Sequence, residues 1–301
     1  MICLKCHYLI DNLDKPHYGL HGQCFRQWFA VSDSVEFISL QRRSSGGSDL
    51  DKRVASQNTS FFHGTFKKYS ANLDGHSYIL KMRQDEAPEL PEVECLCNEI
   101  GELLNVPVAE FYLIDFNGDR TFVTKNFIKP GVPTDLQHIY HFRAHDQHSC
   151  EGIIQAIAEK TQSRYDVTVF IRVLLFDALI GNHDRHGRNL AFVVTAKGAS
   201  LSPIYDNVSY LSLEQGPMLK ADFNPTGKVS TSLTHEPSMK DYVQELIRLG
   251  YRAEVLRFHK SIKLSKLYQL IDDSFCSLLM KDAIKALVSK RFKELENEIL
   301  C

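Results

Sequence analysis

The stretch GNHDRHGRN at residues 181–189 decides the fold of this chain, together with PIYDN at residues 203–207. Asp184 stands five positions before Asn189, and Asp206 follows beyond a short apolar segment. In enzymes that transfer phosphoryl groups, an Asp in this position accepts the proton of the acceptor hydroxyl, while the Asn and the later Asp hold metal ions. The transition state spreads charge over the phosphate oxygens, so positioned charges provide most of the catalysis. The two stretches therefore predict a phosphoryl-transfer site with Asp184 as base and with Asn189 and Asp206 as Mg²⁺ ligands.

The segments around these stretches predict how the three side chains meet. Residues 190–194 form an apolar run typical of a strand, residues 197–200 resemble a turn, and residues 201–205 resemble a returning strand. A returning strand would bring Asp206 beside the end that carries Asn189. Apolar residues at helical spacing predict a buried helix before the loop: Val169, Phe170, Val173, Leu174 and Ala178. The alternative is an Asp-rich surface loop that matches the pattern by chance.

His186 stands two positions after the predicted base. An imidazole at this place can donate a hydrogen bond to a phosphate oxygen in either protonation state. We therefore predict that His186 belongs to the catalytic residues. The alternative is that it only caps the loop.

Length and composition exclude several classes of protein. A chain of 301 residues with 44% hydrophobic content can bury a large core. Its net charge of −2 provides no basic field to replace DNA counterions, which argues against direct nucleic-acid binding. Apolar runs are too short to cross a membrane, and Lys5 and His7 precede no apolar signal segment. We expect a cytoplasmic protein that makes no membrane contact.

The first 38 residues contain a pattern typical of a zinc site. Cys3 and Cys6 form a CxxC pair, and His21 and Cys24 form an HxxC pair after a turn-rich connector. Two ligands at each of two tight turns suit a tetrahedral structural Zn²⁺, and a small element needs such a staple. We predict a zinc-knuckle-like element at residues 1–38. The alternative is four packed side chains without an ion.

Residues 39–57 are polar and rich in Ser and Gly, which predicts a mobile linker. The next segment is the better candidate for a phosphate-binding loop, because it combines hydroxyl residues, a Gly and a Lys ahead of a strand. We assign Ser60, Gly64 and Lys67 to ATP binding.

The strand predicted at residues 77–82 carries Lys81, where a nucleotide lobe needs a cation for the phosphates. A helix is predicted over residues 92–104, and either Glu94 or Glu99 on it could pair with Lys81. Glu94 is preferred because it lies in the first turns. The alternative is that Lys81 is only an edge-strand charge.

The remaining elements complete two lobes. A hairpin is predicted around Asn117-Gly118, and it runs into a hinge where Lys125 and Phe127 would meet adenine. Beyond residue 237 four helices are predicted, at residues 242–249, 253–258, 266–280 and 281–299.

From about Thr59 to its C-terminus, the chain resembles HipA-type serine/threonine kinases, which are toxins of bacterial toxin–antitoxin modules. The resemblance rests on the strand with Lys81, on the stretch at residues 179–189 and on residues 203–206. It implies an α+β, bilobal protein-kinase-like fold, with a small mixed nucleotide lobe at residues 58–130 and a larger, mainly helical catalytic lobe at residues 131–301. It also implies ATP and Mg²⁺ as cofactors and transfer of phosphate to Ser or Thr residues of proteins. In some members of the family these proteins are aminoacyl-tRNA synthetases.

The same resemblance implies partners and self-regulation. The expected partners are a helix-turn-helix antitoxin and a small HipS-like protein, because the chain resembles the compact HipT-like toxin of the three-component version. Autophosphorylation is expected on Thr59 or Ser60, where added negative charge would repel nucleotide phosphates. The loop departs from the family pattern Ser-x-Ser-Gly-x-Gln, because bulky Phe61 and Phe62 precede Gly64.

Two other functions remain open at this point. The order Asp184-Arg185-His186 with Asn189 also resembles the catalytic loop of phosphoinositide kinases, so a small-molecule or lipid kinase is the first alternative. A pseudokinase that serves as an interaction module is the second.

Overall fold

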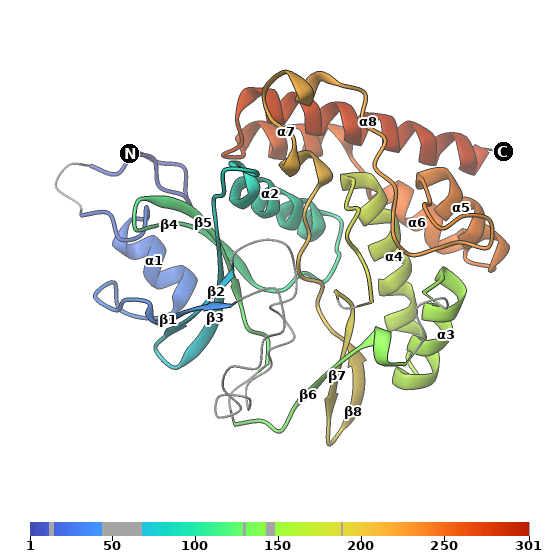
Figure 1. Cartoon of the computed structure of the whole chain (residues 1–301), viewed down its shortest axis with the longest axis horizontal. Helices are drawn as coiled ribbons and strands as arrows, with labels where there is room; N and C mark the ends of the chain where they lie inside the picture. The colour runs from blue at the N-terminus through green and yellow to red at the C-terminus, as the bar shows by residue number, and fades with distance from the viewer. Residues whose placement is uncertain (12–14, 44–67, 129–130, 143–147, 188, 301) are drawn as a thin grey trace. The chain divides into compact units, whose positions relative to one another are not determined.

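The computed structural model of the chain describes residues 1–11, 15–43, 68–128, 131–142, 148–187 and 189–300. The chain divides into two compact units, drawn in Figure 1. Unit 1 comprises Met1–Cys95 and Ala109–Pro130, and unit 2 comprises Leu96–Val108 and Gly131–Cys301. The division after residue 130 coincides with the predicted lobe boundary, whereas residues 96–108 join unit 2.

Unit 1 is built on a five-stranded antiparallel sheet in the order β1-β2-β3-β5-β4. Its strands are β1 (Ile38–Arg43), β2 (Lys68–Leu73), β3 (His76–Met82), β4 (Phe111–Phe116) and β5 (Asp119–Lys125). Asp74-Gly75 and Asn117-Gly118 close two of its hairpins, and all four residues have positive φ. Such two-residue turns match the twist of the flanking strands. The hairpin predicted around Asn117-Gly118 is confirmed.

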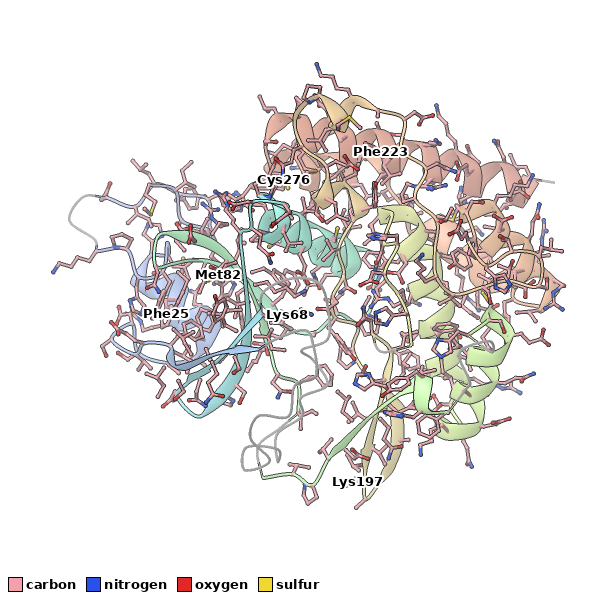
Figure 2. The ribbon with its side chains drawn as sticks, viewed as in Figure 1. Phe25, Lys68, Met82, Lys197, Phe223 and Cys276 are labelled. Carbon is pink, nitrogen blue, oxygen red and sulfur yellow. The ribbon has the colours of Figure 1, made fainter. Side chains whose placement is uncertain are left out.

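The N-terminal segment packs on this sheet through aromatic rings. Phe29, at the end of α1 (Gly22–Phe29), lies 4.4 Å from the ring centroid of Tyr112 and 5.8 Å from that of Tyr78. Phe25, labelled in Figure 2, is buried between Tyr18 and Phe29. Paired aromatic rings add about 0.5–1.5 kcal/mol beyond the area that they bury.

Strand β1 corrects the predicted linker at residues 39–57. Residues 39–43 belong to β1, which pairs with β2 at the edge of the sheet, and residues 44–57 lie outside the described part of the chain. The polar composition of this stretch suggested a loop. Edge strands, however, carry charged residues readily, because one of their sides faces away from the rest of the sheet.

Helix α2 (Leu90–Leu103) follows β3 and matches the helix predicted at residues 92–104. Its first part belongs to unit 1, and its remainder belongs to unit 2.

Unit 2 combines a small sheet with a set of helices. The sheet is antiparallel and has the order β6-β7-β8, with β6 (Asp135–His138), β7 (Ala191–Thr195) and β8 (Gly198–Leu201). Its α-helices are α3 (Cys150–Thr161), α4 (Arg164–Ile180), α5 (Met239–Arg248), α6 (Arg252–Ser261), α7 (Leu264–Asp273) and α8 (Leu278–Leu300). None of the helices in the described residues combines the length and apolarity that crossing a membrane requires. The mixture of helices with antiparallel sheets confirms the α+β class.

Helix α4 is the buried helix predicted before residue 181. It packs against α3, α5, α6 and α8, so apolar residues lie on all its sides. The side chain of Ser163 caps its N-terminus by accepting a hydrogen bond from the backbone N–H of Asp166. Gly181 ends the helix with φ 69°, and a Cβ there would lie 2.8 Å from both Leu287 and Pro225. Backbone conformation and space both require glycine at the start of the loop.

Two predicted elements differ from the structure in position. The returning strand is β8 at residues 198–201, not residues 201–205. Pro203 has no N–H for the ladder, so the chain leaves the sheet, and Ile204 donates to the carbonyl of Pro107 at 2.7 Å. The break between the last two helices lies at residues 274–277, not after residue 280, because Ser277 accepts from the N–H of Met280 as a helix cap.

Candidate active site

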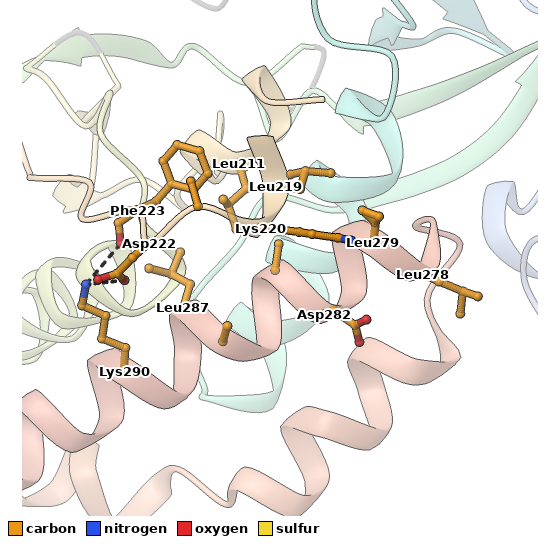
Figure 3. Close-up of a pocket in the computed structure, with 13 residues that line it drawn as sticks. Leu211, Leu219, Lys220, Asp222, Phe223, Leu278, Leu279, Asp282, Leu287 and Lys290 are labelled. Carbon is orange, nitrogen blue, oxygen red and sulfur yellow. Dashed lines mark hydrogen bonds and ion pairs between the residues drawn. The ribbon is translucent and has the colours of Figure 1, made fainter. Parts of the chain in front are cut away.

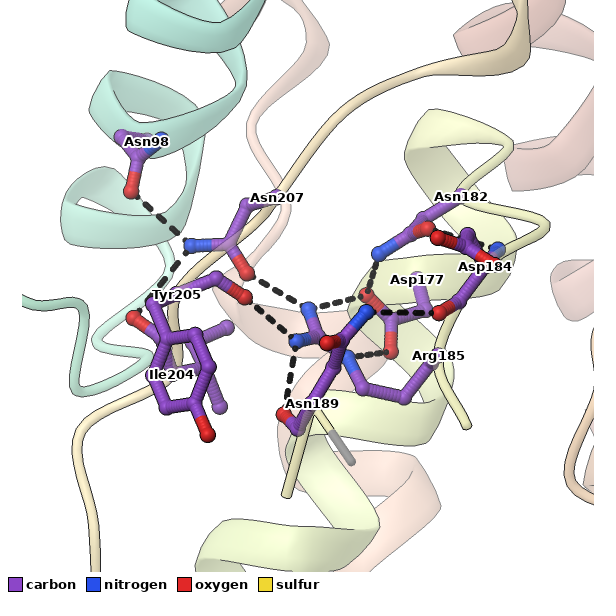
Figure 4. Close-up of polar contacts among 9 residues, drawn as sticks. All are labelled: Asn98, Asp177, Asn182, Asp184, Arg185, Asn189, Ile204, Tyr205 and Asn207. Atoms are coloured by element: carbon purple, nitrogen blue, oxygen red, sulfur yellow. Dashed lines mark hydrogen bonds and ion pairs between the residues drawn. The ribbon is translucent and has the colours of Figure 1, made fainter. Parts of the chain in front are cut away.

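The loop at residues 181–189 joins the end of α4 to β7, and Arg185 lies at its centre. The guanidinium is fully buried and donates to both carboxylate oxygens of Asp177, with Nε 2.8 Å from Oδ2 and Nη2 3.0 Å from Oδ1. Nη1 donates to the carbonyl of Tyr205 at 2.8 Å, and Nη2 donates to Oδ1 of Asn207 at 2.5 Å. Figure 4 shows this network, which ties the loop to α4 and to the chain on both sides of Asp206.

The charge of Arg185 is stabilised where it lies. Burial disfavours the charged guanidinium, but the neighbouring carboxylate of Asp177 outweighs this effect and raises the pKa of Arg185 above its ordinary value. The planar guanidinium donates two hydrogen bonds to one carboxylate, so it positions its partners more strictly than the ammonium group of a lysine could.

The backbone of Asp184 is held from two sides. Its N–H donates to Oδ1 of Asn182 at 3.0 Å, and its carbonyl accepts from Nδ2 of Asn189 at 2.9 Å. Its side chain is 58% exposed, so the carboxylate faces away from the buried network. A fixed backbone with an accessible carboxylate suits a base that meets a substrate hydroxyl.

His186 lies beside the predicted base. Its Nε2 is 3.7 Å from Oδ1 of Asp184, so the structure brings the two predicted catalytic side chains together. Its backbone N–H donates to the carbonyl of Asp184 at 2.9 Å, which closes a tight turn in the loop.

Asp206 occupies a special backbone position, with φ 56° in the left-handed region. Residues other than Gly adopt this conformation rarely, and they cluster at functional sites when they do. The segment is held on both sides: the carbonyl of Tyr205 accepts from Arg185, while Nδ2 of Asn207 donates to Oδ1 of Asn98 at 2.9 Å. The backbone around Asp206 is thereby held on both sides.

The two predicted metal ligands, Asn189 and Asp206, fit a hard cation. Asp206 offers carboxylate oxygens, and Asn189 offers Oδ1, because its Nδ2 bonds the carbonyl of Asp184. An all-oxygen set with few carboxylates is the kind that Mg²⁺ uses beside phosphates.

Lys81 is a buried residue of unit 1 and forms an ion pair with Glu94, the partner that we preferred over Glu99. Its Nζ also lies 5.7 Å from the ring centroid of Phe122. The pair corrects the alternative of an edge-strand charge, because β3 is an inner strand between β2 and β5.

Only some of the other residues predicted to bind ATP lie in the described part of the chain. Lys125 is described, and its Nζ donates to Glu110 at 3.3 Å. Phe127 is described and half-buried. The loop residues Thr59, Ser60, Gly64 and Lys67 lie outside the described residues.

The four predicted zinc ligands come together in unit 1. The ligand atoms of Cys3, Cys6, His21 and Cys24 all lie within 4.8 Å of one another.

Five residues of the Arg185 network were not predicted: Asn98, Asp177, Asn182, Arg185 and Asn207. A signal existed for one of them, because Asp177 interrupts the otherwise apolar second half of α4. A buried acid in an apolar helix needs a cation nearby, and Arg185 lies eight positions later.

A separate cavity of about 540 Å³ lies in unit 2, between α8 and the 3-10 helices η4 (Tyr210–Leu213) and η5 (Gly216–Lys220), as Figure 3 shows. Leu211, Leu219 and Leu287 provide an apolar lining. It contains none of the predicted catalytic residues.

Comparison with known sequences identifies relatives. The sequence model of the HipA-like C-terminal domain family matches residues 50–290. The chain is 26% identical over 211 residues to the putative kinase Y4dM of Sinorhizobium fredii, a match that covers 61% of this chain and 51% of that protein. The chain therefore spans about half the length of this curated relative.

Two solved structures share the fold. The Helicobacter pylori proinflammatory kinase CtkA matches with a TM-score of 0.65 at 17% identity, over 77% of this chain and 93% of that chain. A chain of the Shewanella oneidensis MR-1 toxin–antitoxin complex of HipA, HipB and operator DNA matches with a TM-score of 0.57 at 14% identity, over 86% and 72%. They confirm the predicted kinase-like fold. Together with the match over residues 50–290, this means that the chain belongs to the HipA-like C-terminal domain family.

Proposed function

We propose that this protein is an ATP-dependent serine/threonine protein kinase of HipA type. The observation that carries the proposal is the Arg185 network, which holds Asp184, Asn189 and the backbone around Asp206 in one arrangement. A binding module has no need for a buried charge network that leaves an accessible carboxylate at its edge. The buried Lys81–Glu94 pair gives further support, because kinases use such a pair for the nucleotide phosphates.

In the proposed reaction, a substrate hydroxyl attacks the γ-phosphorus of ATP and ADP leaves. Asp184 accepts the hydroxyl proton at a carboxylate oxygen, and His186 donates a hydrogen bond to a phosphate oxygen. Asn189 and Asp206 would hold Mg²⁺, which neutralises phosphate charge when it is bound. Lys81 is proposed to contact the phosphates, with Glu94 keeping its ammonium group in place.

We also propose a biological role as the toxin of a toxin–antitoxin module. The resemblance to HipA-type toxins supports this role, as does the fold shared with the Shewanella oneidensis complex of HipA and HipB. A helix-turn-helix antitoxin and a HipS-like protein are the proposed partners, and an aminoacyl-tRNA synthetase is the proposed substrate. Phosphorylation of Thr59 or Ser60 is the proposed self-limiting step.

The acceptor class is tested with the purified chain, Mg²⁺ and γ-labelled ATP, in one reaction with a cell extract and in another with phosphoinositide-containing vesicles. We expect label on protein Ser or Thr, and mass spectrometry of the chain itself should find phosphate at Thr59 or Ser60. An Asp184→Asn variant should lose both signals. Label that enters only the lipid or the small-molecule fraction would instead establish the lipid or small-molecule kinase, and no transfer to any acceptor would favour the pseudokinase.

A further inference from the structure

A cluster of three thiols and one imidazole lies outside the kinase machinery, in the described part of residues 1–37, here called the N-terminal cap. Cys3 and Cys6 lie in a turn, in which the N–H of Cys3 donates to the carbonyl of Tyr8 at 2.9 Å. His21 and Cys24 lie at the start of α1. The family match begins at residue 50, so it does not include this cluster.

The distances within the cluster fit tetrahedral coordination. Nδ1 of His21 lies 3.4 Å from Sγ of Cys6 and 3.9 Å from Sγ of Cys24. Zinc bonds of about 2.3 Å to sulfur and about 2.0 Å to nitrogen, at a tetrahedral angle, would separate the two ligand atoms by about 3.5 Å. The observed distances lie on either side of this value.

The second nitrogen of His21 orients its ring. Nε2 lies 3.2 Å from the carbonyl oxygen of Leu9, which can only accept. Nε2 therefore carries the proton, and Nδ1 presents its lone pair to the thiols. Metal-bound histidines are almost always held in this way by an outer partner.

The cluster joins the turn that carries Cys3 and Cys6 to the start of α1. The N–H of Leu4 donates to the carbonyl of Gly19 at 3.1 Å. The carbonyl of Tyr18 accepts from the N–H of Asp115 on β4 at 3.0 Å. An ion held by Cys3 and Cys6 on one side and by the start of α1 on the other would fix α1 on the sheet. The rings of Phe29, Tyr78 and Tyr112 meet there.

We propose that Cys3, Cys6, His21 and Cys24 bind one zinc ion, and that this ion holds the N-terminal cap on the sheet of unit 1. Three thiolates and an imidazole form a soft donor set that suits zinc and not Mg²⁺. Four protein ligands leave no open position, so the site is structural and not catalytic. The proposal does not depend on kinase activity.

The first test is the metal content of the full chain, purified without chelator. We expect about one zinc per chain in the wild type and its loss in Cys6→Ser. Cys6 is the suitable position because it is only half-buried, so the substitution disturbs packing less than a change at buried Cys3. Cys276→Ser is the matched control, since Cys276 is a buried cysteine of unit 2, and it should keep the zinc.

The second test follows the cap itself and needs no variant. Trp28 is the single tryptophan of the sequence and lies on α1, 5.4 Å from the ring centroid of Tyr112. A polar cavity of about 830 Å³, lined by Cys6, His21 and Cys24, gives chelators access to the cluster. Removal of zinc from the wild type should shift Trp28 emission to longer wavelength and lower the melting temperature, and added Zn²⁺ should reverse both changes.

Cobalt substitution checks the ligands independently, because Co²⁺ in a tetrahedral thiolate site gives intense visible absorption. Wild-type protein without zinc that shows no such band would overturn the proposal, as would zinc loss from Cys276→Ser to the same extent as from Cys6→Ser. Bound zinc whose removal leaves Trp28 emission unchanged would overturn the role in holding the cap.

Discussion

Asp184→Asn is expected to lower the rate of phosphoryl transfer by about 10²- to 10⁴-fold, which is the usual effect of losing a positioned base. The substitution keeps the shape of the side chain. The bonds that hold this residue use its backbone N–H and carbonyl, so the loop should keep its conformation. ATP binding and the free energy of unfolding should therefore change little. Single-turnover transfer of γ-phosphate and nucleotide titration of the same preparation measure the two effects separately.

Asp222→Asn is the matched control for this prediction. Asp222 lies in unit 2, its side chain is 86% exposed, and it pairs with Lys290 on α8. It should transfer phosphate at the wild-type rate. Full transfer by Asp184→Asn would show that another group is the base.

Replacing Arg185 with Leu is expected to destabilise the protein by about 3–5 kcal/mol, because the change leaves the buried carboxylate of Asp177 without its charged partner. The carbonyl of Tyr205 and Oδ1 of Asn207 lose donors as well, so the backbone around Asp206 should lose its position. Denaturant unfolding measures the first effect. Phosphoryl transfer under conditions where the variant is folded measures the second.

Two companion variants separate charge from geometry. Arg185→Lys keeps a buried cation but cannot bond in two places, so it should recover part of the stability and little of the activity. Arg257→Leu removes an Arg that is 66% exposed and paired with Glu254, and it should cost no more than about 1 kcal/mol. If Arg185→Leu costs as little as Arg257→Leu, the network does not hold the site in the way proposed here.

The parts of the site that could be predicted from the sequence are those with local spacing. The interval between Asp184 and Asn189 lies within one loop, and Asn117-Gly118 encodes its own turn geometry. The Lys81–Glu94 pair could be anticipated because a strand and the following helix carry its two members. The CxxC and HxxC pairs likewise predicted that the side chains of Cys3, Cys6, His21 and Cys24 lie close together.

The parts that could not be predicted depend on contacts between distant segments. Asn98 and Asn207 are 109 positions apart, and no local pattern connects them. The sequence predicts an exposed Arg185, because charged side chains are seldom buried without partners. Its partners come from α4 and from residues 205–207, and no local pattern links these segments to the loop. The return of the chain toward Asp206 was misplaced because Pro203 ends the sheet pairing, and Ile204 then bonds to residue 107.

We propose that Asp206 and Asn189 hold the metal that accompanies ATP in this site. Calorimetric titration with a non-hydrolysable ATP analogue, with and without Mg²⁺, tests it most directly on the wild type, Asp206→Asn and the control Asp222→Asn. We expect Mg²⁺-dependent binding to the wild type and to the control. Binding to Asp206→Asn should be weakened at least about tenfold, since even changes to the outer partners of metal ligands cost about 10- to 100-fold. Equal Mg²⁺-dependent binding by the wild type and Asp206→Asn would contradict this assignment of the metal ligands. So would an affinity of the wild type for the analogue that does not depend on Mg²⁺.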